Sequence, residues 1–172
     1  MADKAIIHFS SKLLTDEIQV LTGKRGFQGG TFSYTPVNNT EGWYYKLTNV
    51  TNASTDLIAG VILQKKDTGI AVGSSPATIH TDDVVRFLWI YNTGTIDGSS
   101  ASTDSVYICL DGDTAAYNLV DALEIPTGQV WFGRMPNTTV ANIHAITAQA
   151  NGGGASSSNV QCIVAAVIDD VA

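Results

Sequence analysis

The stretches VVRFLWIYN at residues 84–92 and VQCIVAAVI at residues 160–168 decide the fold of this chain. Arg86 is the one charged residue in the first stretch, and the second has none. Successive side chains of a strand point to opposite faces of a sheet, so each stretch predicts a strand that is apolar on both faces. In an antiparallel fold, such a strand is either central to two packed layers or in contact with another subunit.

Short runs of β-branched and aromatic residues recur on both sides of these stretches. Threonine, valine and isoleucine make up 49 of the 172 residues, and branching at Cβ favours strands over helices. Turn-forming glycine, asparagine, serine and aspartate separate the runs. This spacing indicates an antiparallel sandwich, barrel or jelly roll, and we expect an all-β protein built as an antiparallel β-sandwich or jelly roll. The further strands are predicted at residues 4–9, 17–22, 31–34, 43–50, 57–64, 105–111, 129–135 and 139–147.

The length fits one domain, which we place at residues 31–172, after an N-terminal arm or first strands at residues 1–30. Two structures compete for residues 114–123. Asp113 would cap a helix there, since apolar residues at 116, 119, 120 and 123 follow a helical period. Asp111-Gly112 before the segment and Ile125-Pro126 after it favour instead a loop between two strands.

Charge disfavours two classes of partner. The formal net charge is -7, and binding to nucleic acid or to an acidic membrane begins with a basic surface. We therefore expect neither partner, and no apolar run reaches the 18 residues of a membrane-spanning helix. Residues 1–66 carry seven basic and five acidic residues, whereas residues 67–172 carry two and eleven, so the charge is bipolar.

Patterns typical of catalysis or metal binding are missing. Histidines stand apart at positions 8, 80 and 144, without the pairing that would hold a metal. Cys109 and Cys162 each lie in an apolar run, which predicts buried free thiols rather than a nucleophile. The glycine-rich residues 23–30 lack the Gly-Lys-Thr/Ser ending of a phosphate loop. We expect a non-enzyme with no catalytic residue, no metal and no cofactor.

Seven aromatic residues allow two interpretations. They would line a sugar-binding face if they pointed outward, or fill the core if they pointed inward. Because they lie inside predicted strands, core packing is the interpretation we favour for Trp43, Tyr44, Tyr45, Trp89, Tyr91, Trp131 and Phe132.

The N-terminal residues have the features of a docking arm. Ile6 and Ile7 could add a strand to a partner's sheet, and Lys12, Lys24 and Arg25 could contact an acidic surface, with residues 23–30 as a glycine-rich hinge. These five residues are the predicted partner contacts. The alternative is that residues 5–9 form an ordinary first strand of the sandwich.

The segments FLWIYNTG at 87–94, SVYICLDG at 105–112, NTTVANIHAI at 137–146 and VAAVIDD at 164–170 resemble small β-rich virion proteins of tailed bacteriophages. The similarity covers about residues 84–172 and carries over no catalytic residue. It implies a capsid decoration (cement) protein on the virion surface, whose partners are the major capsid protein and other copies of itself in a homotrimer. A tail or fibre component and a carbohydrate-binding β-sandwich module remain as alternatives.

Overall fold

A computed structural model of the chain describes residues 5–9, 30–34, 40–61, 64–65, 78–156 and 158–171. The chain divides into two compact units, Met1–Val37 and Asn38–Ala172. In the first unit, β1 (Ala5–Phe9) pairs antiparallel with β2 (Gly30–Tyr34) as a two-stranded sheet. The predicted strand at residues 17–22 lies outside the described residues.

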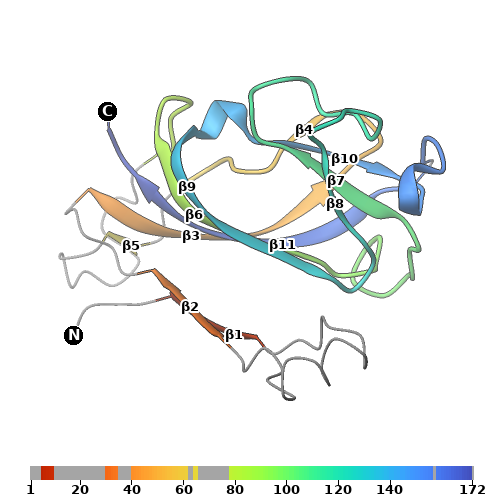
Figure 1. The fold of residues 1–172 in the computed structure, drawn as a ribbon, viewed down its shortest axis with the longest axis horizontal. Coiled ribbons are helices and arrows are strands. Elements are labelled where there is room, and N and C mark those ends of the chain that lie inside the picture. Colours follow the sequence, from red (N-terminus) through yellow and green to blue (C-terminus); the bar gives the residue numbers. More distant parts are fainter. Residues whose placement is uncertain are drawn as a thin grey trace, which may run out of the picture. The chain divides into compact units, whose positions relative to one another are not determined.

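The second unit is a sandwich of two antiparallel sheets, which Figure 1 shows as two layers. The five-stranded sheet has the order β5-β3-β11-β6-β9, with β3 (Glu41–Val50), β5 (Gln64–Lys65), β6 (Val84–Asn92), β9 (Val130–Thr139) and β11 (Val160–Asp169). The four-stranded sheet has the order β4-β10-β7-β8, with β4 (Thr55–Asp56), β7 (Ser105–Cys109), β8 (Leu123–Ile125) and β10 (His144–Ala148). Two short 3-10 helices, η1 (Val140–Asn142) and η2 (Ala150–Gly152), lie in the connections.

The strand order is that of a jelly roll. With the two-residue β5 set aside, the strands numbered one to eight along the chain lie in the orders 1-8-3-6 and 2-7-4-5. Two such four-stranded sheets, packed face to face, define the double Greek key of a jelly roll. The predicted all-β antiparallel sandwich is therefore confirmed, and this strand order also matches the jelly-roll alternative.

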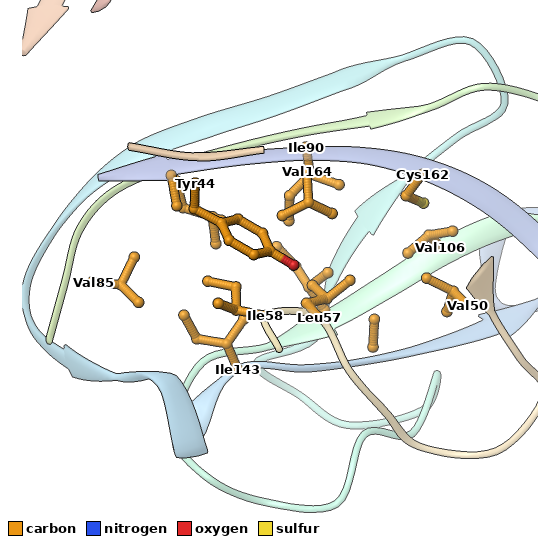
Figure 2. Packing of buried hydrophobic residues seen from close by; sticks show 14 of the residues in the cluster. Tyr44, Val50, Leu57, Ile58, Val85, Ile90, Val106, Ile143, Cys162 and Val164 are labelled. Carbon is orange, nitrogen blue, oxygen red and sulfur yellow. The ribbon is translucent and has the colours of Figure 1, made fainter. Parts of the chain in front are cut away.

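The core lies between the two sheets and follows the strand alternation. On β11, Val160, Cys162, Val164, Ala166 and Ile168 face the four-stranded sheet and are buried. Figure 2 shows Tyr44 reaching from β3 into this space, and its hydroxyl lies 3.4 Å from the backbone oxygen of Ala59. That hydrogen bond gives the buried phenol a partner, as a buried polar group requires.

Two predicted strands are interrupted in the structure, and a third segment decides between the predicted loop and the predicted helix. Residues 139–147 are not one strand, because η1 divides the end of β9 from β10 where the chain crosses between sheets. Residues 57–64 are not one strand either: Leu57 and Ile58 enter the core from an irregular connection. Residues 114–122 form a loop with turn bonds from Leu119 N to Ala116 O and from Ala122 N to Leu119 O, so the predicted loop is confirmed and the helix is wrong.

A comparison of a buried leucine with an exposed leucine tests which face of the five-stranded sheet meets the core. Leu57→Ala removes a fully buried side chain and should lower the free energy of unfolding by about 2–5 kcal/mol. Leu47→Ala is the matched control, because Leu47 is half exposed and should cost about 1 kcal/mol or less. Urea unfolding followed by circular dichroism measures both, and equal losses would contradict the assignment of faces.

Candidate functional site

The face of the five-stranded sheet opposite the core forms a continuous apolar surface, which we call the outer face. The pairing of β3, β11, β6 and β9 aligns its side chains in three rows that cross all four strands. The rows are Leu47, Ile163, Tyr91 and Val130; Tyr45, Ala165, Trp89 and Phe132; and Trp43, Val167, Phe87 and Arg134. Eleven of these twelve positions are aliphatic or aromatic.

Exposure changes across the outer face. Tyr45, Leu47 and Val130 are 57%, 51% and 43% exposed, whereas Phe87 and Val167 in the third row are 3% and 0% exposed. In the middle, the rings of Trp89 and Tyr91 lie 6.2 Å apart at an interplanar angle of 35°. The first two rows thus present large apolar side chains to the surface.

Polar groups border the outer face at both ends. Beyond the first row are Asn49 and Gln161, and the hydroxyl of Thr93 donates to the backbone oxygen of Gln161 at 2.7 Å. Beyond the third row, Arg86 Nη2 lies 2.7 Å from Asp169 Oδ2, and Arg86 Nε lies 3.9 Å from Glu41 Oε1. An apolar centre within a polar rim is the usual anatomy of a protein interface.

The size of the outer face can be derived from sheet geometry. Neighbouring strands lie about 4.8 Å apart and alternate residues about 6.8 Å apart, so the two exposed rows across four strands cover roughly 260 Å². The largest apolar patch on a typical monomer measures about 300–600 Å² and is often functional. The exposed part of the outer face is slightly smaller than this range, and its apolar composition is that of an interface centre.

The interpretation of the aromatic residues as core is wrong for most of them. Tyr44 belongs to the core cluster and Trp131 packs against it. Trp43, Tyr45, Trp89, Tyr91 and Phe132 occupy the outer face instead. The sequence could not show this, because a strand that is apolar on both faces carries no signal for which face meets the second sheet. The indole nitrogen of Trp43 is buried and has no acceptor in the part of the chain that the structure describes.

The predicted partner contacts fall in the first unit. Ile6 and Ile7 lie on β1, opposite Ser33 and Phe32 of β2. Lys12, Lys24 and Arg25 are outside the described residues. Their role in binding a partner stays a prediction.

Both cysteines are free and buried, as predicted. Burial raises the pKa of Cys162 to about 12 and also raises the pKa of Cys109 above its ordinary value. A thiol that resists ionisation is a poor nucleophile.

The histidines are less isolated than the sequence suggested. His80 and His144 line one cavity, and His144 Nδ1 lies 3.0 Å from Asp56 Oδ1. Strand pairing creates this contact, since Asp56 of β4 is directly opposite His144 of β10. Within the described ranges, no three histidine, cysteine or acidic residues are grouped closely enough to hold a metal ion.

Comparison with protein-family models, with curated proteins and with solved structures found no match for this chain. In the parts that the structure describes, no helix has the length and apolar character needed to cross a membrane.

The buried thiols should be protected in the native protein. At pH 8 we expect neither Cys109 nor Cys162 to react with iodoacetamide, because both side chains are buried and neutral. In denaturing urea both should react within minutes. Mass spectrometry of the labelled protein measures this, and rapid labelling of the native protein at Cys162 would contradict the assigned core.

Proposed function

We propose that this chain is a non-enzymatic virion structural protein, a capsid decoration protein that binds the major capsid protein and stabilises the shell. The observation that carries the proposal is the outer face, where apolar side chains fill all eight positions of the two exposed rows. The jelly-roll order supports it, because viral capsid domains and lectins use this architecture. The resemblance of residues 84–172 to phage virion proteins is the third support.

The outer face is suited to docking because strand pairing holds its side chains in place before a partner arrives. Pairing along β3, β11 and β6 sets their spacing, so little conformational entropy is lost on binding. One such face would bury roughly 500 Å² in total with its partner, below the 1,200–2,000 Å² that is about the usual size of a stable interface. A homotrimer would present three faces at once, and this multivalency would hold the protein on a shell.

Charge supports the same proposal. The unit Asn38–Ala172 holds five basic and thirteen acidic residues, a net charge of -8. Complementary charge at the rim speeds association and fixes orientation more than it adds affinity. We therefore expect a partner surface with basic groups around an apolar centre.

A charge placed in the outer face should abolish docking without unfolding the protein. Leu47→Asp puts a carboxylate at the exposed end of β3, where partner contact would desolvate it. Cosedimentation with capsids of the encoding virus should fall at least tenfold. Val120→Asp is the matched control, since this valine is fully exposed in the loop before β8 and its change should leave binding intact. If both variants keep the native circular dichroism and bind equally, the outer face is not the docking surface.

Removal of residues 1–22 tests the predicted arm. If the arm anchors the protein, the truncated chain should stay folded by circular dichroism but no longer cosediment with capsids. Loss of the folded spectrum would place these residues in the structural core, and normal binding would show that Ile6, Ile7 and Lys12 are not needed.

A carbohydrate-binding module is the second candidate function. The observation that favours it is the outward placement of Tyr45, Trp89 and Tyr91, because aromatic side chains pair a large apolar surface with a polar group in tyrosine and tryptophan. A glycan array separates the two functions: binding lost in Trp89→Ala would favour the module. Recovery of the protein only on detached tails would favour the tail or fibre component.

A further inference from the structure

A cavity of about 310 Å³ opens at the end of the sandwich where several connections meet. Its walls come from residues 56–60, residues 79–81 and residues 140–144. Backbone hydrogen bonds join these walls, from Ile79 N to Gly60 O at 2.9 Å and from Ala141 N to Thr81 O at 3.0 Å. The cavity is thus formed before any ligand arrives, and its volume is at the small end of the range for ligand sites.

The cavity has an apolar floor and a polar rim. Ile58 and Val140 of the core cluster form the floor, and Ile79 packs against that cluster. The rim carries His144, which is hydrogen-bonded to Asp56, together with His80 and Thr81. Asp56 lines the cavity and its side chain is 74% exposed, so its carboxylate is accessible from solvent.

Among the residues that line the cavity, Asp56 carries the carboxylate. A carboxylate offers about four acceptor positions, so the hydrogen bond that Asp56 Oδ1 accepts from the ring nitrogen of His144 leaves the second oxygen able to accept. Asp82 is exposed beside Thr81, and exposed Asp111 precedes Gly112, whose backbone nitrogen donates to Asn142 O at 3.2 Å. Lys46 does not line the cavity, but its ammonium lies 3.3 Å from the backbone oxygen of Ala59, which does.

We infer that this cavity binds the end of a lysine side chain presented by a partner protein. The four methylene groups would cover Ile58, Ile79 and Val140, as the stems of long basic side chains cover apolar surface. The ammonium would donate a charge-assisted hydrogen bond to the second carboxylate oxygen of Asp56. An anion is disfavoured by the same carboxylates, and this inference does not depend on the proposed capsid function.

A matched pair of probes tests the inference with the full-length protein. Nα-acetyl-lysine methylamide and Nα-acetyl-norleucine methylamide have similar stems, but only the first carries a charge. Nuclear magnetic resonance titration at constant ionic strength should shift amides in residues 56–60, 79–81 and 140–144. The lysine probe should bind about 1.5- to fivefold more tightly, the range that an exposed ion pair supports.

Variants assign that preference to Asp56. Asp56→Asn should remove the difference between the two probes while leaving the norleucine probe unchanged. Asp97→Asn is the control, because it makes the same change of charge in the loop at the other end of β6 and keeps an acceptor for Ser99 and Ser100. Ala141→Phe should fill the cavity and abolish binding of both probes.

Three results would overturn the inference. Equal affinities for the two probes would define a purely apolar cavity. Shifts spread evenly over exposed carboxylates would indicate nonspecific counterion binding. A charge preference that survives Asp56→Asn would place the cation elsewhere. A folded spectrum of each variant is required for every comparison, and none of these results bears on cosedimentation with capsids.

Discussion

Strand β11 is paired along both edges, with β3 over ten residues on one side and with β6 on the other, and the five-stranded sheet depends on this register. A shift of one residue would exchange its two faces. Val164 and Ala166 would then turn outward, and Ala165 and Val167 would turn toward the core. These four residues are apolar, but the same shift would also turn Gln161 and Asp169 toward the core, so the polar residues at the two ends of β11 disfavour it. The core side accommodates small residues opposite Tyr44 and Leu88, which pair with Ala166 on either side. On the outer face Ala165 lies in the same way between Tyr45 and Trp89, so the polar ends of β11, rather than side-chain volume, distinguish the two registers.

Because strands such as β6 and β11 are apolar on both faces, the sequence predicts the strands but not which of their faces meets the core. Residues 84–92 were placed as a strand with the bounds of β6, because an apolar run between turn residues is a strong local signal. The outer face was missed because Trp43, Trp89 and Phe132 are aromatic residues in strands, and composition does not say which layer they meet. Residues 57–60 and 140–143 are predicted as parts of strands but lie in connections. Their apolar side chains pack into the core without a regular period, so the sequence pattern does not distinguish them from strand residues. The contact between His144 and Asp56 joins positions 88 residues apart and follows only from the pairing of β10 with β4.

The apolar outer face could cause nonspecific association, and the charged residues near it limit that association. Large exposed apolar patches promote nonspecific association, and proteins restrain it with charge near the patch. Here Arg86 bridges the nearly buried carboxylates of Asp169 and Glu41 at one end, while the rest of the unit carries a large negative excess. Like-charged copies repel each other beyond the patch, over a screening distance of about 8 Å at physiological salt. A partner with basic groups is not repelled. The negative charge therefore disfavours contact between the outer faces of two copies and favours binding to such a partner.

The outer face and the cavity differ in what they can contribute to an assembly. The outer face is broad and apolar, so it supplies attraction with little preference for exact chemistry. The cavity is small and takes one side chain, so it supplies position and orientation with little attraction. A protein that holds two neighbouring subunits together needs contacts with both, since a single contact adds no link between them. Two surfaces on different parts of one sandwich meet that need. The sandwich core joins the outer face on β6 to the cavity beside β10. A displacement of one bound neighbour would therefore strain the contact with the other. This coupling is the physical basis on which such a protein would reinforce a shell.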